Sequence, residues 1–150
     1  MMTSNPLDMN YTQMCNWWDR YKKDKEGWAY LKKPSPILLT TLYAKMVVEG
    51  SIIANKWVTL ACKRHLKDLK RQGTDDFPWI FDEEKAWRPI RFIEKKCIPS
   101  KGSAKQLVLQ PWQHFIVGSM FGWVHKDTGY RRFREGLAFV GRKNGKRFAV

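Results

Sequence analysis

A short apolar run that leads straight into a basic, glycine-containing loop constrains the fold of this chain more than any other feature of its sequence. Residues 137–140 read Leu-Ala-Phe-Val and are bounded by glycines, as is typical of a buried parallel strand. Residues 141–146 follow as Gly-Arg-Lys-Asn-Gly-Lys, and residues 147–150 are interpreted as the start of a helix. Strand, loop and helix in this order predict an α/β fold. Because a lone parallel strand cannot make a sheet, we expect the natural fold to be cut at Val150.

The loop carries part of the chemistry of a phosphate-binding loop. Such a loop needs glycines that let backbone N–H groups approach the phosphates, a helix N-terminus aimed at the anion, and a lysine that reaches the outer phosphates. Gly145 and Lys146 supply the last glycine and the lysine. The standard pattern has its first glycine where this chain has Val140, and its Mg²⁺-binding Ser or Thr where this chain has Arg147. The segment alone leaves two interpretations open, a nucleotide-binding loop and a basic turn that contacts the DNA backbone.

The first half of the chain is predicted to be helical. Apolar residues recur at three-and-four spacing over residues 10–27, 37–48 and 51–72. The third helix is predicted to start at Ser51 as its N-cap and to end at Gly73. Its apolar residues are predicted to point inward: Ile53, Trp57, Leu60, Ala61, Leu66 and Leu69. Its cations are predicted to point outward: Lys63, Arg64, Lys67, Lys70 and Arg71.

Further helices are predicted downstream. Asp82 is positioned to cap a helix that buries Ala86, Trp87, Ile90 and Ile93, and a break at residues 99–102 closes that unit. A short β-type run at 107–109 precedes a helix that begins at Pro111 and continues through Trp123, and residues 125–129 are predicted to form a turn.

Composition limits the partners and the setting. The chain has 28 Lys and Arg residues against 14 Asp and Glu, a formal charge of +14, which favours a polyanionic partner, although a well-solvated surface is the simpler alternative. The three cysteines form no CxxC pair, which indicates a reducing, cytoplasmic setting. No apolar stretch approaches the length of a membrane span and the start of the chain does not read as a signal peptide, so we expect no membrane association.

Several short motifs occur in an order that resembles one family. They are Lys-Asp-Leu at 67–69, Ile-Arg-Phe-Ile-Glu at 90–94, Leu-Gln-Pro-Trp-Gln at 109–113, Phe-Gly-Trp at 121–123, Gly-Tyr-Arg-Arg-Phe-Arg at 129–134 and the run at 140–146. Together they resemble the terminase large subunit family of tailed phages, in the branch whose loop reads close to Arg-Lys-Asn-Gly-Lys-Ser. The similarity covers most of the chain after Tyr43.

The resemblance implies a two-part motor. In that family a P-loop ATPase moves double-stranded DNA into the procapsid and an RNase H-like nuclease cuts the concatemer, in the cytoplasm of the bacterial host, with a terminase small subunit and the portal ring as partners. The resemblance divides this chain into a helical region at 1–103 and the incomplete start of a P-loop ATPase domain at 104–150. The implied cofactors are ATP and Mg²⁺.

The resemblance also assigns roles to single residues. Lys146 matches the lysine that contacts the outer phosphates, Arg142 matches an arginine that stabilises charge at the γ-phosphate, and these two are the implied catalytic residues. Gln113 matches a glutamine that contacts adenine, because an amide can both donate to and accept from a purine edge. The full implied nucleotide-binding set is Gln113, Gly141, Arg142, Lys143, Asn144, Gly145 and Lys146.

Departures from the family pattern leave the activity of this chain open. Arg147 has no acceptor with which to ligate a cation, which puts Mg²⁺ binding in doubt. The second acidic motif, the catalytic glutamate and the nuclease are not within the 150 residues, so we expect the chain alone to be inactive as a motor and a nuclease. The alternatives are a small basic DNA-binding or phage assembly protein without enzymatic activity, and a degraded prophage remnant.

The remaining candidate residues receive structural interpretations. His65, His114 and His125 have no acid or nucleophile near them in the sequence and are given no catalytic role. Trp17, Trp18 and Trp112 are interpreted as core residues rather than base-stacking ones. The acidic residues at 75, 76 and 82–84 are interpreted as a solvated turn and a helix N-terminus rather than as a metal site.

Overall fold

The chain forms five helices and a two-stranded sheet within the residues that the structure describes. This computed structural model describes residues 8–23, with side chains to residue 19, and residues 38–98 and 107–141. The elements are α1 (Tyr11–Lys23), α2 (Leu39–Val48), α3 (Lys56–Arg71), β1 (Trp79–Phe81), α4 (Glu83–Lys96), α5 (Pro111–Gly122) and β2 (Trp123–His125). The predicted α/β class is therefore confirmed at the level of helices with a small sheet.

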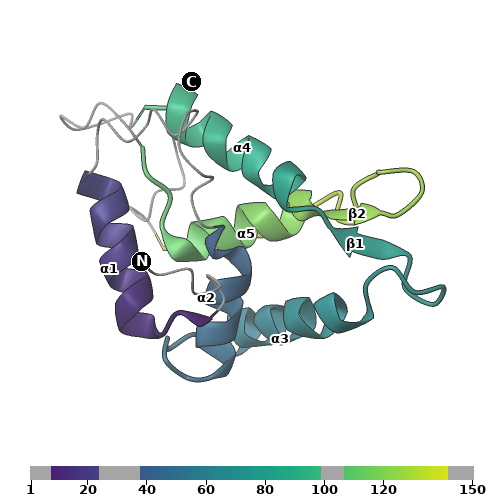
Figure 1. Ribbon diagram of the computed structural model, residues 1–150, viewed down its shortest axis with the longest axis horizontal. Helices are drawn as coiled ribbons and strands as arrows, with labels where there is room; N and C mark the ends of the chain where they lie inside the picture. The colour runs from purple at the N-terminus through teal and green to yellow at the C-terminus, as the bar shows by residue number, and fades with distance from the viewer. Residues whose placement is uncertain (1–7, 24–37, 99–106, 142–150) are drawn as a thin grey trace.

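Helix α5 lies at the centre of this arrangement. It packs against α4 on one side and α2 on the other, and α2 packs in turn against α3 (Figure 1). The sheet lies at the end of α4 and α5, where β1 pairs antiparallel with β2 and Phe81 is opposite Trp123. After the turn that follows β2, residues 130–132 return beside it, because Val124 bridges Arg131 and the Arg132 N–H donates to the Trp123 carbonyl at 2.9 Å.

A close approach of α2 to α5 depends on one glycine. A Cβ atom at Gly118 would overlap Oγ1 of Thr40. That hydroxyl donates a buried hydrogen bond to the carbonyl of His114 at 2.8 Å, so the two helices are joined by a polar contact as well as by packing. Among the described residues, the apolar core on either side of α5 centres on Leu38, Trp87, Ile90 and Leu109 and on Tyr43, Val47, Cys62 and Phe115.

Most predicted helices are confirmed. Helices α1, α2, α4 and α5 lie within a residue or two of their predicted starts. Asp82 caps α4 by accepting a hydrogen bond from the Lys85 N–H at 3.0 Å, and Pro111 occupies the first turn of α5. Trp18 is partly buried and its indole donates to the Leu109 carbonyl at 3.2 Å, so its interpretation as a packed residue is confirmed.

The predicted start of α3 is wrong, and its predicted inner face is confirmed only in part, since Ala61 and Leu66 pack against the core. The helix begins at Lys56 and is capped by Asn55, whose side chain accepts from the Val58 N–H at 2.9 Å. Ile53, Trp57 and Leu60 are 97%, 74% and 47% exposed. The buried face instead carries Cys62, His65 and Asp68, two of them polar, because each polar side chain has hydrogen-bond partners that offset the cost of burial.

The two predicted strands are also wrong. Residues 107–109 are extended but belong to no strand, and the Leu109 N–H donates to the buried Glu94 carboxylate at 2.9 Å. Residues 137–140 pair with no strand in the described part of the chain, and Leu137 and Phe139 are 93% and 97% exposed. An apolar run forms a strand only where another strand supplies its hydrogen bonds. The strands that do form, β1 and β2, come from the aromatic segments at residues 79–81 and 123–125, and the second of these ends the helix that was predicted to run through Trp123.

Candidate functional site

Two of the seven predicted nucleotide-binding residues lie in the described part of the chain. Gln113 is in the first turn of α5, and Gly141 ends the described C-terminal segment, where it is exposed. Arg142, Lys143, Asn144, Gly145 and Lys146 lie outside the described residues, as does Arg147. Their predicted roles therefore stay predictions, and so does the domain boundary at residues 103 and 104.

Gln113 helps to begin α5. Its carboxamide oxygen accepts a hydrogen bond from the Gln110 N–H at 2.8 Å, so it satisfies a backbone donor that the helix leaves free. The indole of Trp112 donates to the side-chain oxygen of Gln110 at 3.0 Å, and its ring packs against the Tyr43 and Phe115 cluster.

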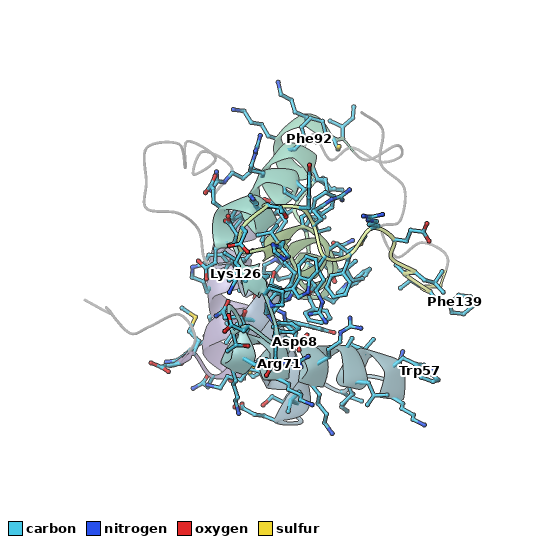
Figure 2. All side chains as sticks on the ribbon, turned by 90° about the vertical axis from the view of Figure 1, so that its right-hand side faces the viewer. Trp57, Asp68, Arg71, Phe92, Lys126 and Phe139 are labelled. Atoms are coloured by element: carbon cyan, nitrogen blue, oxygen red, sulfur yellow. The ribbon has the colours of Figure 1, made fainter. Side chains whose placement is uncertain are left out.

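A buried carboxylate ties α3 to the segment that precedes the loop. Asp68 is fully buried and accepts from Arg132 at 2.6 Å and from Arg71 at 2.7 and 3.0 Å. Figure 2 shows Asp68 and Arg71 side by side on α3. Burial by itself raises the pKa of the Asp68 carboxyl, but hydrogen bonds and charge from the two guanidinium groups outweigh it and hold the pKa below its usual value.

Arg132 is enclosed by aromatic rings as well. Its guanidinium lies 4.7 Å from the ring centre of Phe77, 4.8 Å from that of Phe133 and 5.8 Å from that of Trp123. The excess of basic residues favours a polyanionic partner, and Arg132 belongs to the basic motif at 129–134. The contacts of Arg132 instead give it a structural role, because the aromatic rings and the buried carboxylate both hold its side chain against the protein.

His65 completes the buried polar group. The Trp123 indole donates to Nδ1 of His65 at 3.1 Å, and Nε2 lies 3.0 Å from the Thr41 hydroxyl. An indole N–H can only donate, so Nδ1 is unprotonated and the proton of the neutral ring is on Nε2. Burial accordingly lowers the pKa of His65 to about 4, with Arg64 adding to the shift and Asp68 opposing it.

The other two histidines also have acids near them, and the prediction that none is close in the sequence is wrong for His125. Nε2 of the fully buried His114 lies 3.7 Å from Oε1 of Glu94, and Nδ1 of His125 lies 3.9 Å from Asp127. Neither ring nitrogen of His114 has a hydrogen-bond partner in the described part of the chain. His114 packs edge-on against Trp87, in the interior between α4 and α5.

A pocket lies where α3, α5, β2 and the C-terminal segment meet. Its volume is about 350 Å³, and its walls include Arg64, Phe115, Ser119, Met120 and Leu137. The Ser119 hydroxyl is buried there without a hydrogen-bond partner among the described residues. Residues 133 and 135–138 form one wall of the pocket, so the segment that leads to Gly141 packs against α3 and α5 even though it forms no strand.

Comparison with known proteins bears on the interpretation of this region. Residues 111–150 match the family model described as terminase large subunit, ATPase domain. The match supports a phage terminase large subunit. It does not favour a small non-enzymatic assembly protein. The terminase ATPase match spans both Gln113 and the loop at 141–146, and no curated protein and no solved structure matches the chain.

Two absences among the described residues concern membrane spans and metal clusters. No helix among them is long and apolar enough to cross a membrane. They also hold no cluster of three His, Cys, Asp or Glu side chains that suits a metal ion. Asp82 instead caps α4, with Glu83 and Glu84 in the first turn, as the structural interpretation of these acids predicted.

Sequence reasoning missed the buried group of Asp68, His65, Trp123 and Arg132. One signal for it was present, because Asp68 is the only acid in a helix that carries six Lys and Arg residues. A single carboxylate surrounded by cations is a candidate for a buried ion pair. Its main partner Arg132 is 64 residues away in the chain, so no spacing rule identifies it.

Replacement of His65 by Gln should flatten the dependence of stability on pH. Between pH 6.5 and 4 the unfolded chain binds a proton at this histidine and the folded chain does not, so the free energy of unfolding falls as the pH falls through this window. The contribution of His65 over the window is about 3 kcal/mol. Chemical denaturation at a series of pH values measures it. His125→Gln, which changes a partly exposed histidine, is the control, and an equal pH dependence in wild type and His65→Gln would contradict the assignment.

Proposed function

We propose that this chain forms the nucleotide-binding start of a DNA-packaging ATPase. The observation that carries the proposal is the terminase ATPase match over residues 111–150, which includes Gln113 and every residue of the predicted phosphate-binding loop. The described structure supports it in one respect. Arg132, bound to Asp68, holds the residues before the loop against α3, so a loop at 141–146 would extend from an anchored segment.

In this proposal the loop and Gln113 bind opposite ends of ATP. Gly141 and Gly145 let backbone N–H groups approach the phosphates, while Lys146 contacts the outer phosphates and Arg142 stabilises negative charge at the γ-phosphate. Lys143 and Asn144 complete the loop. Gln113 contacts the adenine edge with its amide group while its oxygen also caps α5.

Magnesium does not fit the residues of this chain in the usual way. Where the P-loop has a Ser or Thr that ligates Mg²⁺, the chain has Arg147, and a guanidinium group offers no oxygen or lone pair to a cation. A positive side chain at this position would instead lie close to the phosphates. We therefore assign no step of hydrolysis to this chain and restrict the proposal to nucleotide binding.

The wider role proposed for the chain follows the family. A terminase large subunit packages double-stranded DNA into a procapsid and cuts it, together with a terminase small subunit and the portal ring. The net charge of +14 is consistent with a DNA partner, because neutralising phosphates releases condensed counterions. The packaging and cutting activities and these partners belong to the proposal.

Replacement of Lys146 by Ala should weaken ATP binding. The loss of a charged hydrogen bond to phosphate costs about 1.5–3 kcal/mol, or roughly a 10- to 100-fold increase in Kd. Isothermal titration of the full chain with ATP measures the change. Lys95→Ala removes one exposed positive charge from the last turn of α4 and is the matched control. An unchanged Kd for Lys146→Ala would refute the phosphate-binding loop.

Replacement of Gln113 by Glu should separate its capping hydrogen bond from its proposed contact with adenine. Glu keeps an oxygen that can accept from the Gln110 N–H and is favourable near a helix N-terminus, so stability should change by less than about 0.5 kcal/mol. It loses the amide donor, so a preference for ATP over GTP should fall by about tenfold. The control is Gln13→Glu, because Gln13 accepts from the Asn10 N–H at 2.9 Å in the same way at the start of α1. A preserved nucleotide preference in Gln113→Glu would contradict the adenine contact.

A further inference from the structure

Helix α3 presents a line of lysines to solvent. Lys56, Lys63, Lys67 and Lys70 are all on its outer side, and all four are exposed. At 100° per residue these positions fall within a stripe about 60° wide, and at 1.5 Å per residue the stripe is about 21 Å long. The buried positions Cys62 and His65 lie on the opposite side of the helix, so the stripe points away from the body of the protein.

The positive charge of this stripe is not offset on its own helix. The only acid in α3 is Asp68, which is buried and already bound by Arg71 and Arg132. Helix α4, by contrast, has Glu83 and Glu84 exposed in its first turn, and Glu84 pairs with Arg91 at 3.0 Å. The four lysines of the stripe make no ion pair with any residue that the structure describes.

An exposed aromatic residue lies at the start of the stripe. Trp57 is 74% exposed and projects from the end of α3, as Figure 2 shows. The Lys56 ammonium lies 5.5 Å from the centre of its ring. A large flat side chain beside lysines offers apolar contact to the sugars of a nucleic acid strand, in addition to charge.

We propose that the α3 stripe, formed by Lys56, Lys63, Lys67 and Lys70, binds the phosphate backbone of double-stranded DNA. A line of charges about 21 Å long fits a linear polyanion, and duplex DNA carries a negative charge for about every 1.7 Å of its axis. A membrane is a poorer fit, because the apolar face of α3 packs against α2 and is not free to enter lipid. The inference rests on the proposed packaging function, which identifies the polymer as DNA. It adds the surface of this chain that binds the DNA.

The triple variant Lys63→Ala, Lys67→Ala, Lys70→Ala tests this surface. The matched control is Arg88→Ala, Lys95→Ala, Lys96→Ala, which removes the same charge from exposed positions of α4. Alanine favours helix, so both variants should fold, and far-UV circular dichroism with thermal unfolding checks this. Binding of a fluorescent duplex of random sequence to the full chain is measured by anisotropy at several salt concentrations, without nucleotide. Because no nucleotide is present, a negative result for DNA binding is distinguishable from a negative result in the ATP-binding experiment.

The α3 variant should bind the duplex at least about tenfold more weakly at about 0.1 M salt, and the slope of log K against log salt should fall by about 0.9 for each phosphate that is no longer neutralised. The α4 control should stay within about twofold of wild type, because its cations lie off the proposed surface. Equal reductions in the two variants would show that only net charge matters and would overturn the proposal. So would unchanged binding in the α3 variant. Displacement of the duplex from wild type by poly-L-glutamate at equal charge concentration would overturn it in favour of an acidic protein partner.

Discussion

The buried carboxylate of Asp68 is the interaction on which the arrangement of the C-terminal segment depends. A carboxylate loses most of its hydration when it is fully buried, and only paired charges and hydrogen bonds compensate for that loss. Asp68 obtains them from Arg71 on its own helix and from Arg132, which comes after the sheet. The pair therefore joins α3 to a distant part of the chain, at the point from which residues 133–141 continue toward the predicted loop. Removal of either guanidinium would leave the buried carboxylate with only one of its two charged partners.

Helix α5 and the sheet also connect α3 to the segment that follows β2. Helix α5 carries Gln113 at its first turn and leads directly into β2 at its other end, so one rigid element connects a predicted adenine contact to Trp123. Trp123 then donates to His65 on α3 and stacks with Arg132. This hydrogen bond requires His65 to be neutral, because its Nδ1 must remain an acceptor. Apolar packing, one buried ion pair and one neutral histidine thus hold α3, α5 and the segment after β2 in a fixed relation.

Local signals predicted the helices well, and contacts between distant residues account for what they missed. Asp82 and Pro111 marked helix starts correctly because capping and the first-turn preference of proline act within a few residues. The inner face of α3 was misjudged in part, because Trp57 is exposed and Asp68 is buried. The burial of Asp68 depends on Arg71 and on the distant Arg132. The run at 137–140 was read as a strand from its composition, whereas a strand needs a neighbour that its own sequence does not specify. In the candidate site Gln113 was placed at the start of a helix, but its capping hydrogen bond with the Gln110 N–H was not predicted.

A double-mutant cycle on Asp68 and Arg132 tests the account most directly. Asp68→Asn, Arg132→Gln and the double variant are compared with wild type by chemical denaturation of the full chain at neutral pH. The account predicts that the two side chains are coupled by about 2–4 kcal/mol, because each single variant leaves a buried polar group without its partner. The exposed pair Glu84 and Arg91, treated in the same way, should show a coupling below about 1 kcal/mol. Additive effects of Asp68→Asn and Arg132→Gln would show that the buried pair does not hold the C-terminal segment to α3.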